Sequence, residues 1–215
     1  MAARTMVTGA LTGVAMALVL SLAVPAGAED IRPSVSGDVQ VALPGQVLRP
    51  MRDGERLEAG STVATGAASH AVLRFPDGQQ VLLGAHTNLR VVNYRYDPAH
   101  AHGDRCEFEL ARGTARFITG LMGKRSPDAI TLRTAQVAIA VRDADFSVAV
   151  LNPTYLSVRH GAVVASTAAG TMVFMEGVSG AMAHAAELPL VVSASALPEA
   201  VSASFADLAG VRYSP

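Results

Sequence analysis

The feature that most constrains the fold is an alternation of apolar and polar residues with a period of two. Residues 71–75 read Ala-Val-Leu-Arg-Phe and residues 106–110 read Cys-Glu-Phe-Glu-Leu. Successive side chains of a β-strand point to opposite faces of the sheet, so alternation of this kind predicts half-buried strands with one solvated face. Glycine turns and the Pro-Asp-Gly sequence at 76–78 separate these segments and predict tight reversals between them.

The same reasoning predicts a series of short strands along the chain. Their spacing leaves few gaps long enough for a crossover helix, which excludes a doubly wound α/β fold and predicts an all-β domain. Near the C-terminus we expect two more strands and a short helix at 198–209 with Val201, Phe205 and Leu208 on one face. The predicted strands are 35–41, 81–83, 89–94, 115–118, 130–134, 137–141, 146–150, 155–159, 162–165, 171–174 and 188–192.

The N-terminal region has the pattern of an export signal. Arg4 precedes an apolar stretch at 10–24, and Ala26-Gly27-Ala28 forms a small-x-small cleavage sequence. We therefore predict a signal peptide over 1–28, cleaved after Ala28, and a periplasmic or otherwise exported protein. The alternative is an uncleaved segment that stays as a membrane anchor, which would be the protein's only membrane contact.

Composition excludes several functional classes. Lysine and arginine number 17 against 18 acidic residues, so the chain lacks the basic surface that nucleic-acid binding needs. Cys106 is the single cysteine, which excludes an intrachain disulfide, and we interpret it as a small buried residue of its strand. No nucleophile elbow, zinc helix or phosphate-binding loop is present, so we expect no enzyme activity and no cofactor.

Two acidic or histidine-containing segments are candidates for chemistry. In the polar loop 97–104, His100, His102 and Asp104, with Cys106 beyond, have the residue types of a zinc or copper site, but a solvated loop explains them better and we predict no metal site. Asp143 and Asp145 are two residues apart and fit either paired carboxylates or a turn.

A series of short sequence motifs, here called phrases, runs from Val35 to Val164. Together they resemble the FecR domain, a periplasmic sensing module of bacterial transmembrane signalling. The phrases are Gly54-Glu55-Arg56-Leu57, Thr65-Gly66, Asp77-Gly78, Leu110 to Gly120 and Thr134-Ala135. The last family phrase departs, because Asp143-Ala144 replaces a Gly-Thr after Val141-Arg142 and Ala140 stands where glycine is usual. The resemblance implies structural roles for Gly54, Leu57, Gly66, Asp77, Gly78, Gly113, Arg116, Gly120, Arg142 and Phe146.

The resemblance also implies an architecture and a function. We expect a β-solenoid-like or two-sheet stack of short strands over 29–169, with 170–215 as a C-terminal extension docked on it. A noncatalytic periplasmic module that contacts another envelope protein, a receptor or a membrane regulator, is the leading hypothesis. It would be free-standing, without the family's cytoplasmic anti-sigma segment. The alternatives are an envelope scaffold that binds glycan or peptidoglycan, with Tyr94, Tyr96 and Tyr155 for stacking, and a metal-dependent enzyme around His100 and His102.

Overall fold

The protein is all-β, as the alternation predicts. The computed structural model describes residues 30–211, so the predicted signal peptide and its cleavage after Ala28 lie outside the described residues. No helix among residues 30–211 is long and apolar enough to cross a membrane. The elements are β1 (Arg32–Ser36), β2 (Val39–Ala42), β3 (Arg49–Pro50), β4 (Thr62–Thr65), β5 (His70–Arg74), β6 (Gln80–Leu83), β7 (Asn88–Arg95), β8 (Arg105–Ile118), α1 (Leu121–Arg125), β9 (Ile130–Arg133), β10 (Ala138–Val150), β11 (Thr154–Thr167), β12 (Gly170–Met175), β13 (Ser179–Met182), β14 (Leu190–Val192), a 3-10 turn η1 (Ala194–Ala196) and α2 (Glu199–Gly210).

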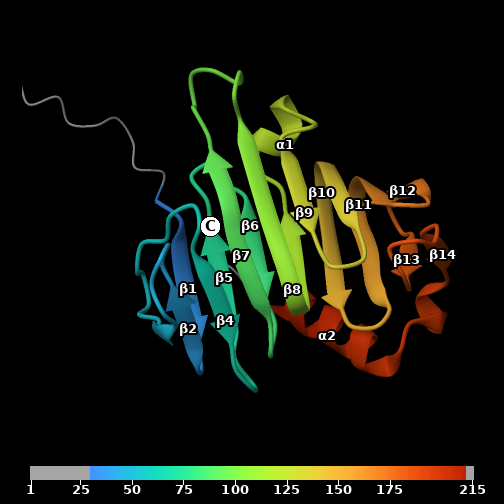
Figure 1. Ribbon diagram of the computed structural model, residues 1–215, viewed down its shortest axis with the longest axis horizontal. Coiled ribbons are helices and arrows are strands. Elements are labelled where there is room, and N and C mark those ends of the chain that lie inside the picture. The colour runs from blue at the N-terminus through green and yellow to red at the C-terminus, as the bar shows by residue number, and fades with distance from the viewer. Residues whose placement is uncertain (1–29, 212–215) are drawn as a thin grey trace, which may run out of the picture.

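The strands form one continuous, open sheet (Figure 1). Every strand pair in the described chain is antiparallel except β8 with β9, which makes the sheet mixed. The sheet branches at β8, because the first half of β8 pairs with β7 and β9 and its second half pairs with β6 and β10. The halves of β10 and β11 likewise have different neighbours: β9 and β12 at one end, β8 and β13 at the other.

These three long strands make the sheet fold over into two layers. The first layer contains β3, β2, β4, β7, β9 and β12, and the second contains β1, β5, β6, β13 and β14; β8, β10 and β11 run through both. The expected architecture of separate short strands is therefore corrected in two respects. The predicted strand 35–41 divides at Gly37, where φ is 83°, into β1 and β2, and three pairs of predicted strands are continuous. Segments 106–110 and 115–118 belong to one strand, as do 137–141 with 146–150 and 155–159 with 162–165.

Each long strand bends at one residue with a positive φ. These residues are Gly113 in β8, Asp143 in β10 and Gly161 in β11, with φ of 89°, 38° and 76°. The bend shifts the alternation by one residue: in β8, Phe108 faces the core before the bend and Phe117 after it. A β-bulge has this effect, and strands commonly pass from one sheet layer to another by such bends. The sequence suggested turns here because the alternation breaks at these points.

The core lies between the two layers. Phe75, which follows β5 of the second layer, meets Phe108 of the first layer edge to face with ring centroids 5.6 Å apart. Phe117 stacks on Phe146 at 5.2 Å, and all four rings belong to one buried cluster. Apolar burial of this kind is the dominant favourable contribution to folding.

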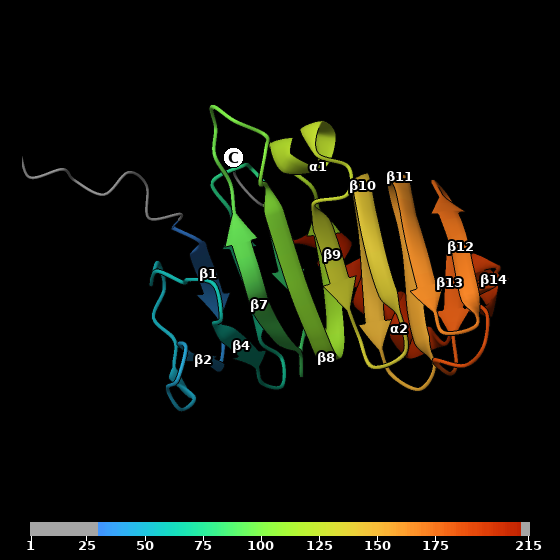
Figure 2. The same ribbon diagram turned by 45° about the horizontal axis from the view of Figure 1, so that its top comes forward.

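A second, smaller apolar cluster lies on the outside of the second layer, where α2 covers the sheet (Figure 2). It consists of Val72, Leu82 and Leu208, with Ile118 and Val211 packed against it. Of the three residues predicted on one face of the helix, Val201 and Leu208 are buried and Phe205 is half-buried.

Candidate interaction sites

The sheet ends in four strands that pair on one side only within the described chain, and the two N-terminal ones are protected. β1 contains Pro33, which has no N–H to offer, and its Val35 N–H donates to Asp53 Oδ1 at 3.1 Å. β3 is two residues long and ends in Pro50. Proline, short length and covering loops are the means by which proteins block edge-to-edge pairing.

Of the two C-terminal strands, which we call the C-terminal edge, β12 lacks such protection, whereas β14 is three residues long and follows Pro189. β12 has six residues without proline or charge, and both Leu190 and Val191 of β14 are exposed on opposite faces. Figure 1 shows β12, β13 and β14 together at one end of the molecule. Half of the large apolar side chains that are exposed in the described chain lie here: Val173, Met175, Leu188, Leu190 and Val191.

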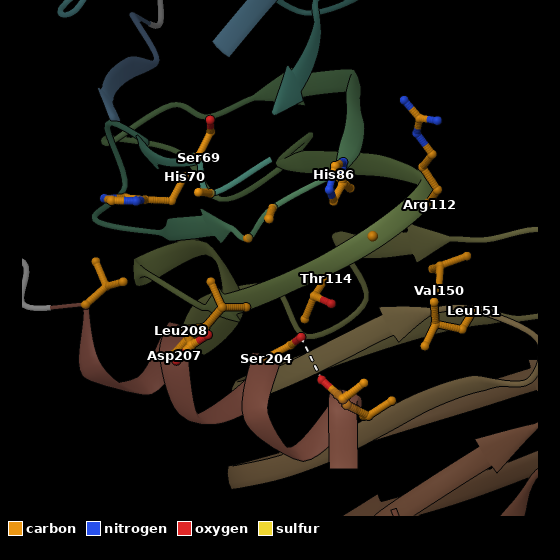
Figure 3. A pocket seen from close by; sticks show the side chains of 17 residues that line it. Ser69, His70, His86, Arg112, Thr114, Val150, Leu151, Ser204, Asp207 and Leu208 are labelled. Atoms are coloured by element: carbon orange, nitrogen blue, oxygen red, sulfur yellow. Dashed lines mark hydrogen bonds between the residues drawn. The ribbon is translucent and has the colours of Figure 1, made fainter. Parts of the chain in front are cut away.

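A groove between α2 and the outer face of β5, β6 and β8 is the second candidate, and we call it the α2 groove. The helix contacts this face through Val201 and Leu208, and a cavity of about 640 Å³ remains beside it. Figure 3 shows Ser204, Asp207 and Leu208 on the side of α2 that faces Thr114. Most of the lining is apolar, which is typical of binding pockets.

The rim of this cavity carries exposed charged and titratable groups. His70, His86 and Arg112 stand on the sheet side, and Asp207 on the helix side (Figure 3). The hydroxyl of Ser204 donates to the carbonyl of Ala200 within the helix at 2.8 Å, so it is not aimed at a ligand. These groups do not form a catalytic arrangement of nucleophile, base and orienting residue.

A nearly buried ion pair lies under α2. Arg116 Nε and Nη2 donate to Asp145 Oδ1 and Oδ2 at 2.8 and 2.6 Å, and the side chains are 6% and 17% exposed. Arg116 Nη1 also donates to the carbonyl of Leu208 at 3.3 Å, near the C-terminal end of the helix. Asp145 thus pairs with an arginine 29 residues away, and not with Asp143 as a catalytic pair would require.

Asp77, one of the motif positions expected to have a structural role, lies in the β5–β6 turn. Its carboxylate, 2% exposed as a residue, accepts from the N–H of Gln79 at 3.1 Å, the hydroxyl of Tyr94 at 3.2 Å and the N–H of Met122 at 3.3 Å. Burial raises the pKa of Asp77 despite these donors, and burial followed by the charge of Asp77 raises the pKa of Tyr94. The group joins the turn, β7 and α1.

The glycines of the motif lie at close approaches or turns. A Cβ on Gly113 would lie 2.4 Å from Thr87 Cα, and one on Gly120 would lie 2.3 Å from the carbonyl oxygen of Asp77. Four other motif positions donate backbone hydrogen bonds to carbonyl groups, three of them distant in the sequence. Gly54 N–H donates to Pro33, Leu57 N–H to Ile31, Gly66 N–H to Asp38 and Gly78 N–H to Phe75.

The bend in β10 forms although the sequence departs here from the FecR pattern that it resembles. Asp143 adopts the left-handed conformation that a glycine would favour, which aspartate tolerates better than most residues. Ala144 is buried, and its N–H donates to Thr119 Oγ1 at 2.9 Å. Ala140 lies in regular pairing with Thr131 and Val164, so it makes no bend. Arg142 reaches the carboxylate of Asp128 at 3.0 Å on the surface.

The histidine loop does not bring its candidate ligands together. Both carboxylate oxygens of Asp104 accept from Arg125, at 2.9 and 3.0 Å, and Cys106 is buried in the core. His100 is hydrogen-bonded to Asp97, and no group of three potential metal ligands occurs among residues 30–211.

Two of the three tyrosines proposed for glycan stacking are unavailable. Tyr94 and Tyr96 are buried, and the guanidinium of Arg125 lies 4.5 Å from the ring centre of Tyr96. Tyr155 alone is half-exposed. A flat aromatic surface for a sugar is therefore not formed by this set.

Comparisons with known proteins show what the chain is similar to. Residues 61–164 match the family described as FecR protein. Two solved structures of a candidate anti-sigma factor from Parabacteroides distasonis ATCC 8503, at 1.65 and 2.50 Å, share the fold with a TM-score of 0.50 and 21% identity. The match covers 61% of this chain and 59% of the other, so the chain spans less than two thirds of that protein. No protein of curated function matches the chain.

Proposed function

We propose, from the premise that residues 61–164 form a FecR-like domain, that the protein is a noncatalytic interaction module of envelope signalling. It acts in the periplasm by binding another envelope protein, a receptor or a membrane regulator. The match to a regulatory family and the fold shared with a candidate anti-sigma factor support a regulatory role.

The observation that carries the proposal is the contrast between the two ends of the sheet. The N-terminal edges are blocked by Pro33 and Pro50, whereas β12 is six residues long, uncharged and proline-free and carries the exposed side chains of Val173 and Met175. An unprotected edge can accept a strand from a partner, whose main chain then supplies hydrogen bonds while side chains such as Val173 and Met175 supply apolar contact. The partner strand would extend the first layer beyond β12.

Site-specific photo-crosslinking in living cells tests this proposal. A photoreactive residue at position 173 or 175 of β12 is compared with one at Leu121, which is equally exposed but lies on α1 at a distance from the edge. We expect covalent capture of one and the same envelope protein from positions 173 and 175, and none from 121.

Val173→Lys with the photoreactive residue at 175, and Met175→Lys with the photoreactive residue at 173, then serve as blocking variants. Lysine on an edge strand prevents strand pairing, while an exposed substitution leaves folding stability nearly unchanged. Capture should therefore disappear in these variants although their urea unfolding midpoints stay at the wild-type value. Equal capture from position 121, or none from the edge, would contradict the proposal.

A further inference from the structure

The geometry points to the α2 groove as a second interaction surface, separate from the C-terminal edge, which accepts an amphipathic helix of a partner protein in place of α2. The inference concerns a different face of the molecule and a different recognition mode from the strand pairing proposed above. It rests on the outer face of the second layer, on the attachment of α2 and on the cavity beside the helix.

The outer face of the second layer is apolar where a solvated face would be polar. Val72 and Leu82 lie between core-facing neighbours on β5 and β6, so their side chains point away from the core. Both are buried all the same, and Ala149 on β10 is fully buried outside the main core cluster. An apolar face of this kind has to be shielded from water. In the structure an α-helix, α2, shields it, which shows that a helix fits this face.

The helix α2 is weakly attached to the sheet. Only Val201 and Leu208 of its twelve residues are buried. Its N-cap is Pro198 without a side-chain hydrogen bond, so one common source of helix stability is missing. β14 and η1, which precede it, contain no buried residue. Local opening of such a segment requires little free energy relative to the core.

α2 also fills its groove incompletely. The positions that face the cavity of about 640 Å³ include the small residues Ala200 and Ser204 (Figure 3). A helix with leucine at these two positions, and apolar residues at 201 and 208 as in α2, would bury more apolar surface in the same groove. Such a helix can therefore compete with α2 even though α2 is tethered.

Arg116 sets the direction of the incoming helix. Its guanidinium is held by Asp145 and donates to the carbonyl of Leu208, one of the last four carbonyls of α2, which have no partner within the helix. A cation at this place favours the negative end of a helix dipole. The partner helix accordingly ends over Arg116, in the orientation that α2 has now.

A labelled peptide with the sequence of residues 198–211, carrying Ala200→Leu and Ser204→Leu, is the probe. It is titrated against the full chain and against the full-chain variant Leu208→Ala, which weakens the resident helix and leaves every residue of the sheet intact. We expect about tenfold tighter binding to Leu208→Ala, because apparent affinity is proportional to the fraction of molecules with an open groove. Ala206→Ser, on the exposed side of α2, is the matched control and should bind like wild type.

Hydrogen exchange supplies the second measurement. Bound peptide should accelerate exchange at the amides of α2 in the full chain and leave exchange at β7 and β8 unchanged. Equal affinity for wild type and Leu208→Ala, no binding to either, or unchanged exchange in α2 would each overturn the inference. Val173→Lys should not alter peptide binding, so failure of the strand-pairing proposal is distinguishable from failure of this one.

Discussion

Two aspartate–arginine pairs anchored on β10 provide a direct test of how burial sets the strength of an ion pair. Asp145 makes a two-point contact with Arg116 beneath α2, and Arg142 meets Asp128 on the surface with side chains 58% and 82% exposed. We compare Asp145→Ala with Asp128→Ala. Both variants remove the carboxylate from an arginine–aspartate pair. The difference between their losses of unfolding free energy therefore measures the effect of burial.

The expected cost of Asp145→Ala is about 3 kcal/mol of unfolding free energy. Removing one partner of a buried pair costs about 3–5 kcal/mol because the other charge stays buried, and the partial exposure of Asp145 places this pair at the lower end. For a domain of this size, a loss of that magnitude lowers the melting temperature by about 6–12 °C. Asp128→Ala should cost no more than about 1 kcal/mol, since water screens an exposed pair.

Urea and thermal unfolding followed by circular dichroism measure both effects. The double variant Arg116→Met with Asp145→Leu should recover much of the loss, because a well-packed apolar pair can replace a buried ion pair. Equal losses for Asp145→Ala and Asp128→Ala, or a loss below about 1 kcal/mol for Asp145→Ala, would refute the reasoning.

Two further predictions concern the bend of β8 at Gly113 and the β5–β6 turn at Asp77. Gly113→Ala and Gly54→Ala both place a Cβ at positive φ, at a cost of about 1–2 kcal/mol. Gly113→Ala should cost about 2 kcal/mol more, because its Cβ would meet the Thr87 backbone whereas Gly54 faces open space; equal urea midpoints would contradict this. Burial raises the pKa of Asp77 in the folded protein, so the folded state binds the proton more tightly than the unfolded chain. Unfolding free energy should then fall as pH rises from about 4 through the raised pKa, and Asp77→Asn should lack this fall. If the unfolding free energies of wild type and Asp77→Asn changed in parallel over that pH range, the Asp77 carboxyl would not be the cause of the fall.

The strands were predictable because their alternation is a local property of the sequence. The bends were not, because a β-bulge interrupts the alternation in the same way as a turn does. At Gly113 the chain continues as one strand because β6 and β10 take over the pairing from β7 and β9, and at Gly161 because β10 pairs with β11 on both sides of the bulge. That pairing is long-range and leaves no mark in the local sequence.

The candidate sites were only partly predictable. Val201 and Leu208 have helical spacing, so the apolar face of α2 was visible in the sequence. The groove beneath it had a weaker signal: Val72 and Leu82 are apolar at positions where a solvated strand face would be polar. Arg116 and Asp145 are 29 residues apart, and no local pattern joins them. The C-terminal edge became visible only once the strand order was known.

The passage of β8, β10 and β11 through both layers determines how the domain responds to force. A partner strand beside β12 would pull on β11, and β11 also holds β13 of the opposite layer. The load would therefore spread along continuous backbone into both layers, and the layers could not slide apart without rupturing hydrogen bonds along three strands. We therefore expect the domain to deform little when a partner strand pulls on β12.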